Sequence, residues 1–377
     1  MQLSNSVQTV LDELIRHGYD AYLVGGAVRN YLLDIESDDY DVTTAANPDT
    51  IKEIFKDYRF YDIGKKHGTV TVLIGEDKID VTPYRFESDY HDHRHPDTVS
   101  FTADLKEDLE RRDFTINAIC LDYEGKVIDL FGGINDLNHK LIRTVGDPYR
   151  RFQEDALRIL RALRFEAKLD FQIEEKTAEA IHGCKDLLKH ISNERKRTEL
   201  LQILSSPAAF RIINEYLDVF NTFMKFKPVD KEKNDFSEPL FALAYLLKDN
   251  ENSPLKELKY SADEISLIDT LIEATKADLS DDYGFIQALS NPFQKETLTF
   301  LEDYHHLDLQ DRYEKLKGYM ITPDQLNLDG DTIRNFGYHN KEIGQIKKTL
   351  TEMVHRQQLK NEKEALQNFL ASHTIAL

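Results

Sequence analysis

The sequence predicts an α+β protein, in which a mixed β-sheet with helices extends to about residue 145 and an all-helical remainder follows. Short apolar runs with strand-like alternation and glycine-containing turns fill the first part. After Pro148 glycine becomes rare, and stretches such as 150–168 and 193–204 carry helical spacing. A chain of 377 residues exceeds a single core. The domains that we expect are 1–145, 146–205, 206–290 and 291–377.

The elements of the first part can be predicted in order. An amphipathic helix comes first, and its apolar face contains Val7, Leu11, Leu14 and Ile15. An apolar strand over residues 21–24 then meets Gly25-Gly26 and a second helix. The alternation of residues 39–43 predicts a half-buried strand, and Pro48 suits the first turn of the next helix. Two β-rich runs, 68–74 and 78–84, flank a turn-like segment and predict an antiparallel hairpin.

The composition favours a cytoplasmic globular protein. Hydrophobic residues make up 41% of the chain, yet no apolar run reaches the roughly eighteen residues of a membrane span. We expect no secretory signal, and Cys120 and Cys184 are too few for a disulfide framework. The net charge of −20 repels phosphate at long range, so any RNA site must be a local basic strip.

Two carboxylates, Asp39 and Asp41, give the strongest chemical signal. On the predicted strand they point to the same side, whereas Tyr40 points to the other. Carboxylates held together repel one another unless a cation lies between them, and oxygen ligands of this kind suit Mg²⁺. Asp80 in the predicted hairpin could complete a three-carboxylate cluster. A solvated acidic turn is the alternative for the pair, and an exposed strand residue is the alternative for Asp80.

The glycine pair Gly25-Gly26 lies between an apolar strand and a helix, where bare backbone N–H groups can meet a phosphate. We expect Arg29 in the first turn of that helix, where a cation opposes the helix dipole and indicates an anionic ligand. A tight turn that needs glycine is the alternative for the pair.

The sequence resembles the class II tRNA nucleotidyltransferases, the bacterial and eukaryotic type of CCA-adding enzyme, which belong with the poly(A) polymerases to one family. Five ordered segments over about residues 20–205 carry the resemblance. The remaining half matches the family only in its general pattern of charged amphipathic helices. The segments are similar to motif A (LVGGAVR at 23–29, DYD at 39–41), motif B (RRDFTINA at 111–118), motif C (DLFGG at 129–133), motif D (EDALR at 154–158, RALRF at 161–165) and motif E (NER at 193–195, with Glu199).

The resemblance implies a polymerase-beta-like nucleotidyltransferase head followed by a helical neck, body and tail. Asp39 and Asp41 would hold two catalytic metal ions, Mg²⁺, with Asp80 as a third carboxylate. The nucleotide-binding residues would be Gly25, Gly26 and Arg29 at the triphosphate, Arg112, Asp113 and Asn117 at the ribose and metal site, and Asp155, Arg158, Arg161 and Arg164 in the neck.

Asp155 and Arg158 are three residues apart, which predicts neighbours on one helix face. A surface ion pair is the alternative explanation of this spacing. In the family the pair reads the incoming base. The carboxylate accepts and the guanidinium donates hydrogen bonds, which suits the edges of cytosine and adenine. Guanine and uracil present a carbonyl and an N–H instead, so both would be rejected.

Two further segments bear on RNA. Arg150, Arg151, Arg161, Arg164 and Lys168, followed by residues 195–197, form a basic strip that could follow the acceptor stem; a solvated helix face is the alternative. The histidines His91, His93 and His95 invite a zinc hypothesis, although no fourth ligand is evident. By resemblance this segment is the flexible loop of full CCA enzymes, in which His95 replaces a usual arginine. Asn30 likewise replaces the aspartate that usually follows Arg29.

The leading hypothesis is an enzyme that adds or repairs the 3′-terminal CCA of tRNA with CTP, ATP and Mg²⁺. The alternatives are a CC-only or A-only enzyme, a bacterial poly(A) polymerase, and a non-catalytic RNA-binding protein. The acidic C-terminal half argues against poly(A) synthesis, and the intact Asp39, Asp41 and Arg158 argue against a silent binding protein. The expected partners are tRNA, CTP and ATP, with no membrane. A monomer and a homodimer are both compatible with the sequence.

Overall fold

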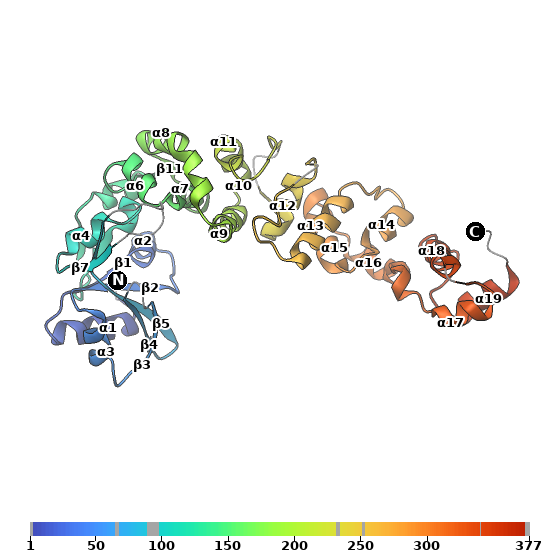
Figure 1. The fold of residues 1–377 in the computed structure, drawn as a ribbon, viewed down its shortest axis with the longest axis horizontal. Helices are drawn as coiled ribbons and strands as arrows, with labels where there is room; N and C mark the ends of the chain where they lie inside the picture. The colour runs from blue at the N-terminus through green and yellow to red at the C-terminus, as the bar shows by residue number, and fades with distance from the viewer. Residues whose placement is uncertain are drawn as a thin grey trace. The chain divides into compact units, whose positions relative to one another are not determined.

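The computed structural model describes residues 3–64, 68–88, 98–230, 234–250, 253–339 and 341–373. The chain forms two compact units, Met1–Lys225 and Phe226–Leu377, and Figure 1 labels their elements. The segment with His91, His93 and His95 lies outside the described residues. The finer division into four domains stays a prediction. No helix in the described ranges combines the length and apolar character needed to cross a membrane.

The first part of the N-terminal unit is a seven-stranded mixed sheet with the strand order β3-β4-β5-β2-β1-β8-β9. Its strands are β1 (Ala21–Val24), β2 (Tyr40–Thr44), β3 (Arg59–Gly64), β4 (Thr69–Ile74), β5 (Asp77–Pro83), β8 (Ile119–Leu121) and β9 (Val127–Asp129). Two small sheets pair β6 (Arg85–Ser88) with β7 (Thr98–Phe101), and β10 (Leu141–Ile142) with β11 (Gln172–Ile173). The helices of this part are α1 (Asn5–Arg16), α2 (Gly26–Leu32), α3 (Pro48–Ile54), α4 (Leu105–Glu110) and α5 (Gly133–Asn138).

Local sequence explains where these helices begin. The Ser4 side chain accepts a hydrogen bond from the backbone of Val7 and caps α1, whose apolar side chains at helical spacing are buried. Asn47 caps α3 by accepting from Thr50, and Pro48 occupies the first turn, where its missing N–H does no harm. The predicted amphipathic helix and the predicted proline-initiated helix are therefore both confirmed.

The pairing of β2 determines which residues meet at the centre of the sheet. Strand β2 is antiparallel to β1, which sets Val24 opposite Asp41. It is parallel to β5, which sets Asp41 beside Asp80. Strands β4 and β5 are antiparallel neighbours, so the predicted hairpin is confirmed. Two aspartates from distant parts of the sequence thus become neighbours across two strands.

Helices α6 (Pro148–Glu154) to α11 complete the N-terminal unit. The others are α7 (Leu157–Leu169), α8 (Glu175–Cys184), α9 (Asn193–Leu204), α10 (Ala209–Glu215) and α11 (Leu217–Phe220). The predicted helix over 193–204 is confirmed. The stretch 150–168, which carries helical spacing, is helical in two pieces, because Asp155 is extended, with φ of −140° and ψ of 103°, and separates α6 from α7.

The described part of the C-terminal unit is helical. Its α-helices are α12 (Pro239–Leu247), α13 (Ala262–Ala274), α14 (Asp282–Leu289), α15 (Gln294–His305), α16 (Gln310–Leu316), α17 (Gly330–Asn335), α18 (Lys341–His355) and α19 (Lys363–Ser372). Short 3-10 helices lie at Lys317–Tyr319 and Pro323–Gln325 in this unit, and at Thr115–Asn117 and Lys185–His190 in the N-terminal unit. One apolar cluster of the C-terminal unit runs from Ala274 to Met320 and another from Ile321 to Leu370. The predicted α+β class, with a mixed sheet before an all-helical remainder, is confirmed.

Candidate active site

The carboxylates predicted to bind metal lie at the middle of the sheet. Asp41 and Asp80 are paired residues of the parallel strands β2 and β5. The Asp80 carboxylate accepts a hydrogen bond of 2.6 Å from the Thr71 hydroxyl, which fixes its orientation. Asp39 directly precedes β2 and is exposed. Within the described ranges no three Asp, Glu, His or Cys side chains converge closely enough to hold a metal. The three carboxylates are therefore neighbours and not an assembled three-ligand site.

The pKa of Asp41 reflects its burial and the negative charge gathered in this cluster. Burial raises the pKa of Asp41 to about 6; Arg112 opposes that rise, whereas Asp39 and Asp80 add to it. A carboxylate that is buried beside two others is stabilised in its charged form by an added cation. This donor set of hard oxygen atoms fits a divalent ion such as Mg²⁺. The residues therefore fit the metal that the family resemblance implies.

Gly25 brings the backbone close to these groups. It caps the N-terminus of α2 with φ of 75° and ψ of −140°, a conformation that essentially requires glycine. A Cβ atom at Gly25 would lie 3.4 Å from Oδ2 of Asp41 and 3.6 Å from Nη1 of Arg112. The missing side chain thus leaves the backbone open beside a carboxylate and a guanidinium, where a phosphate group could approach it.

The same groups line a cavity of about 270 Å³. Its lining includes Asp41 and Asp80 from the two strands, together with Arg111 and Arg112 from the loop after α4. Gly26 is the next residue along the chain, and a Cβ atom there would lie 3.6 Å from Nη2 of Arg29. The cavity therefore combines the carboxylates and the cations that a metal-bound triphosphate requires.

Arg29 is buried, with 5% of its surface exposed. Its guanidinium donates to the side-chain oxygen of Asn117 at 2.7 Å and to that of Asn30 at 2.8 Å and 3.2 Å. Burial lowers its pKa to about 10; Asp113 opposes this, whereas Arg164 and Arg161 contribute to it. Both hydrogen-bond acceptors are uncharged, so an anionic ligand nearby would stabilise this arginine.

The predicted reason for suspecting an anion at Arg29 is wrong. Helix α2 has only 7 residues, and Arg29 lies in its last turn, where a cation agrees with the helix dipole. The short helix, which ends at Leu32, could not be distinguished from a longer one by its apolar spacing. The burial and the uncharged partners of Arg29 remain as the physical argument for an anion.

Asp113 links the loop after α4 to helix α7. Its carboxylate accepts from Asn117 at 3.0 Å and from Nε of Arg161 at 2.8 Å. Burial alone would raise the pKa of Asp113, but Arg161 and the other donors outweigh it and hold the pKa at about 2. Asn117 therefore joins Arg29 to Asp113, and Asp113 joins Arg161. Four of the predicted nucleotide-binding residues form one connected network.

The phenyl ring of Phe165, a residue that the sequence prediction did not assign to the site, is surrounded by arginines. The guanidinium carbons of Arg164, Arg29 and Arg161 lie 4.7, 5.0 and 5.6 Å from its centroid. Each distance is within the range of a cation–π interaction. Arg164 also lies 3.4 Å from Glu199 of α9. One aromatic side chain of α7 thus holds three cations of the candidate site together.

The structure corrects the predicted relation between Asp155 and Arg158. They do not share a helix face, because Asp155 lies in the break before α7. Asp155 forms an ion pair with Arg195 at 2.8 Å and caps the backbone N–H of Leu157. Arg158, which is 8% exposed, pairs with Glu154 at 3.0 Å. The prediction of neighbours on one helix face is wrong, and so is the alternative of an i,i+3 surface ion pair, because each side chain has its own partner.

Arg158 makes two further hydrogen bonds, to the backbone oxygens of Arg151 at 3.1 Å and Arg111 at 2.7 Å. Arg151 donates in turn to the backbone oxygen of Glu110 at 3.0 Å. The backbone oxygens of Glu110 and Arg111 lie at the C-terminal end of α4, where guanidinium groups are favourable. Arg151 and Arg158 thus anchor the loop that carries Arg112.

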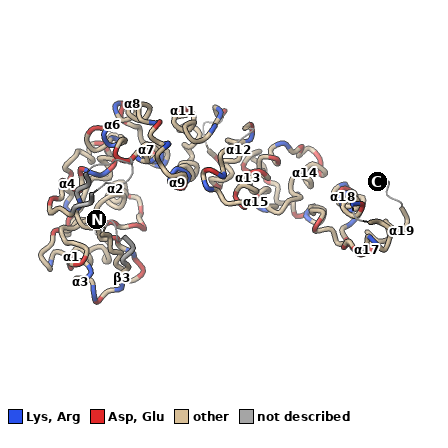
Figure 2. Tube along the Cα trace, viewed as in Figure 1, with Lys and Arg blue, Asp and Glu red and all other residues tan. Residues whose placement is uncertain are grey.

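Part of the predicted basic strip forms ion pairs within the protein. Arg151 is buried and pairs with Glu154. Arg161 is held by Asp113. Arg150 and Lys168 remain exposed. Figure 2 shows acidic residues interspersed with basic ones along the chain.

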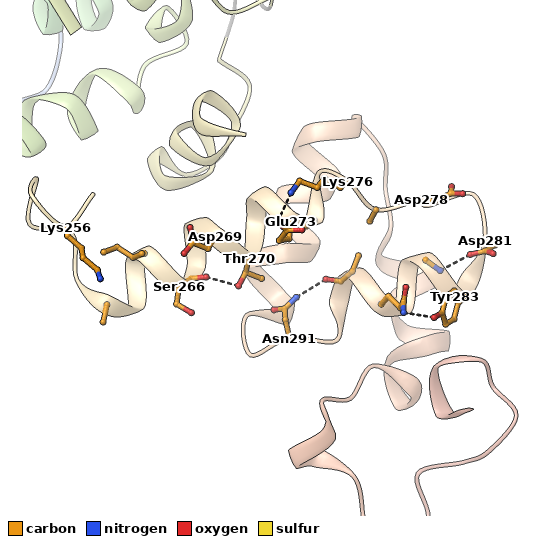
Figure 3. Close-up of a pocket in the computed structure, with 17 residues that line it drawn as sticks. Lys256, Ser266, Asp269, Thr270, Glu273, Lys276, Asp278, Asp281, Tyr283 and Asn291 are labelled. Atoms are coloured by element: carbon orange, nitrogen blue, oxygen red, sulfur yellow. Dashed lines mark hydrogen bonds and ion pairs between the residues drawn. The ribbon is translucent and has the colours of Figure 1, made fainter. Parts of the chain in front are cut away.

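A larger cavity of about 890 Å³ lies in the C-terminal unit between α13 and α14. Figure 3 shows the acidic side chains of Asp269 and Glu273 on α13, of Asp278 after it and of Asp281 at the start of α14. Its charged lining residues are Lys256, Asp269, Glu273, Lys276, Asp278 and Asp281. Carboxylates outnumber lysines, and none of the predicted site residues line it, so this cavity does not suit an anionic nucleotide.

Known proteins match the chain along nearly its whole length. Residues 21–143 match the family model described as the poly A polymerase head domain, and residues 170–218 match one described as a probable RNA and SrmB- binding site of polymerase A. The CCA-adding enzyme of Lactobacillus helveticus (strain DPC 4571) is 35% identical over 388 residues, which cover 96% of this chain and 95% of that protein. The chain belongs to the CCA-adding enzyme family. The predicted family and its enzyme class, a tRNA nucleotidyltransferase, are therefore confirmed.

Two further members of the CCA-adding enzyme family support the assignment. The enzyme of Staphylococcus aureus (strain MRSA252) is 34% identical over 373 residues, which cover 97% of this chain and 87% of that protein. The crystal structure of the Bacillus stearothermophilus CCA-adding enzyme in complex with CTP has a TM-score of 0.78 and 27% identity, and it covers 97% of this chain and 96% of its own. The likeness therefore includes the helical half, for which the motifs gave no information.

Proposed function

We propose that this protein adds or repairs the 3′-terminal CCA of tRNA, using CTP and ATP without a nucleic-acid template and releasing pyrophosphate. The observation that carries the proposal is the cavity lined by Asp41, Asp80 and Arg112, of which Asp41 and Arg112 also lie beside the bare backbone of Gly25. Such a site suits nucleotidyl transfer because it offers anionic ligands for a cation and a cation for the phosphates. The CTP complex of the Bacillus stearothermophilus relative supports the choice of nucleotide.

Mg²⁺ is the proposed cofactor, with Asp39 and Asp41 as its main ligands and Asp80 as a third carboxylate. The raised pKa of Asp41, which burial and the neighbouring carboxylates cause, supports this assignment. When bound, Mg²⁺ would supply Lewis acidity toward the primer 3′-hydroxyl and the leaving pyrophosphate. Asp39 is exposed directly before β2, so its carboxylate would be accessible to the ion.

The head residues are proposed to hold the triphosphate and ribose. Gly25 and Gly26 give access to the backbone, and Arg112 supplies charge at the cavity. Arg29 lies next to Gly26, and its uncharged partners leave its positive charge available to an anion. Asp113 and Asn117 are proposed to set the position of the ribose, because both are buried and bonded to one another.

The neck residues are proposed to choose the base. Asp155 can accept and Arg158 can donate, so together they match the edges of cytosine and adenine and mismatch those of guanine and uracil. Asp155 has to exchange its bond with Arg195 for one with the base, and Arg158 has to do the same with Glu154. Arg161 and Arg164, gathered around Phe165, are proposed to reinforce the binding of the anionic nucleotide.

The test uses the purified protein, Mg²⁺, a tRNA transcript that lacks its terminal CCA, and one labelled nucleotide at a time. We expect CMP incorporation with CTP alone, AMP incorporation only after two cytidines, and no reaction after chelation of the metal. Incorporation of UMP or GMP as readily as CMP would contradict the proposed base selection. Addition that stops after CC, or A addition only to a CC end, would define a partial enzyme. Long AMP tracts on unrelated RNA would identify a poly(A) polymerase, the activity after which the matching head model is named.

A further inference from the structure

The carboxylate of Asp108 is completely buried, with 0% of its surface exposed, although it belongs to the short helix α4. It accepts hydrogen bonds from the Thr43 hydroxyl at 3.1 Å and from the backbone N–H of Arg85 at 3.3 Å. Arg111 donates to it through Nε at 3.0 Å and Nη2 at 2.7 Å, and Arg112 donates through Nη2 at 3.3 Å. One buried side chain therefore ties a strand of the sheet to both arginines of the loop.

We propose that Asp108 is a positioning residue for the incoming nucleoside triphosphate, because it holds Arg112 beside the Gly25 turn. This inference rests on the proposed function of the same cavity, to which it adds a residue that does not itself line the space. Its effect reaches the nucleotide through Arg112, whose Nη1 lies 3.6 Å from the position of a Cβ atom at Gly25.

The restraint on Arg112 comes mainly from Asp108. The Nε atom of Arg112 is buried and has no hydrogen-bond partner in the part of the chain that the structure describes. The bond from Nη2 to Asp108 is the hydrogen bond that holds this guanidinium among the described residues. An arginine side chain has several rotatable bonds, so losing this bond would let it leave the cavity.

Thr43 gives Asp108 a second connection to the site. Thr43 and Asp41 are two residues apart on β2, so their side chains lie on the same face of the sheet. Both line the cavity that contains Arg111 and Arg112. Asp108 therefore contacts the strand that bears a metal-binding candidate and the loop that bears the phosphate-binding candidate, and it fixes the spacing between them.

A carboxylate is the group that this position requires. Burial opposes its charge, but Arg111 and Arg112 outweigh burial and keep the pKa of Asp108 below its usual value. An amide of the same shape would turn an NH2 group toward groups that are themselves donors. It would also carry no negative charge to attract the two guanidinium groups. Replacement of Asp108 by Asn therefore removes the ion pair and leaves the volume of the side chain nearly unchanged.

The experiment compares Asp108→Asn with the wild type and with Glu110→Gln, which makes the same chemical change at an exposed position of the same helix. Steady-state kinetics with CTP on CCA-less tRNA give kcat and both KM values. We expect the KM for CTP to rise about tenfold in Asp108→Asn, because a hydrogen bond to a charged group is lost. The KM for tRNA should stay within about twofold, and Glu110→Gln should match the wild type. A lower folded fraction alone would reduce the apparent kcat and leave the KM for CTP unchanged.

A double-mutant cycle with Arg112→Met tests the pathway of the effect. If Asp108 acts through Arg112, Asp108→Asn/Arg112→Met should bind CTP no more weakly than Arg112→Met alone. Full additivity of the two changes, or an unchanged KM for CTP in Asp108→Asn, would overturn the proposal. A wild-type protein that incorporates no CMP would instead refute the proposed function.

A second pair of variants keeps the test decisive if Asp108→Asn does not fold. Thr43→Val removes one hydrogen bond to Asp108 and retains the volume of the side chain, whereas Thr43→Ser retains the hydroxyl. We expect a smaller rise in the KM for CTP with valine, about threefold, and recovery with serine. Equal KM values for both variants and the wild type would refute the role of Asp108.

Discussion

The Nη2 atom of Arg158 donates a hydrogen bond of 2.7 Å to the backbone oxygen of Arg111, the residue that precedes Arg112. Arg158 belongs to α7, and Arg111 lies in the loop after α4. A side chain proposed to recognise the base is therefore bonded to the loop proposed to hold the triphosphate. Recognition of the correct base and placement of the phosphates are expected to depend on one another through this bond.

The first prediction concerns Arg158→Met. This change removes the donors that cytosine and adenine require, so preference for CMP over UMP and GMP should fall about tenfold to hundredfold. Competition between nucleotides on CCA-less tRNA measures this ratio. Arg16→Met is the control, because it removes an arginine that is 68% exposed in α1. An equal loss of rate with all four nucleotides, at constant preference, would contradict a role in base selection.

The second prediction concerns Asp41→Asn. Turnover should fall about a thousandfold, because a metal ligand contributes several kcal/mol to stabilising the transition state. Binding of tRNA, measured by filter retention, should remain within about twofold. Asp49→Asn makes the same change at a side chain that is 98% exposed, and it should behave like the wild type. Undiminished turnover in Asp41→Asn would remove the central carboxylate from the mechanism.

The third prediction compares two glycines with positive φ. Gly25→Ala should cost about 1 to 3 kcal/mol of stability from backbone strain. It should also raise the KM for CTP, because the new methyl group lies 3.4 Å from Asp41 and 3.6 Å from Arg112. Gly75→Ala also places alanine at a positive φ, but in a turn with open space, and should leave the KM unchanged. A parallel rise in both variants would show that strain, and not the filled space, weakens nucleotide binding.

The fourth prediction concerns stability and pH. Burial of Glu166 and the nearby Glu215 raise its pKa to about 7, from 4.5 in an unfolded chain, although Arg211 opposes them. Between about pH 4.5 and pH 7, Glu166 is therefore protonated in the folded state and ionised in the unfolded state. The stability from this group is full below about pH 4.5 and disappears as the pH rises through 7, by about 2 kcal/mol between pH 5 and pH 8.

Thermal unfolding at pH 5 to 8 checks this expectation. Glu166→Gln cannot ionise, so its unfolding temperature should increase relative to that of the wild type as the pH is raised. Glu175→Gln, which changes an exposed carboxylate of α8, should keep a constant difference. A constant difference for Glu166→Gln as well would show that Glu166 has an ordinary pKa in the folded protein.

The sheet and its aspartates could be predicted because short-range patterns determine them. Alternation identified β2, glycine turns bounded β1 and the hairpin, and these elements bring Asp41 beside Asp80. Helix α9 also follows its predicted range. Strands β8 and β9 are only 3 residues long, so they carry no periodicity that a prediction could use.

The partners of the site arginines could not be predicted in the same way. The acceptor of Arg158 in the head lies 47 residues away, and the break at Asp155 contains neither glycine nor proline. Asp108 did leave a signal, because it precedes Arg111 and Arg112 by 3 and 4 residues, the spacing of helical ion pairs. Spacing alone could not show that this carboxylate is buried against the sheet.

The two apolar clusters of the C-terminal unit meet between Met320 and Ile321. Tyr319 packs against both clusters, so replacement of this one side chain would loosen the packing on both sides of the boundary.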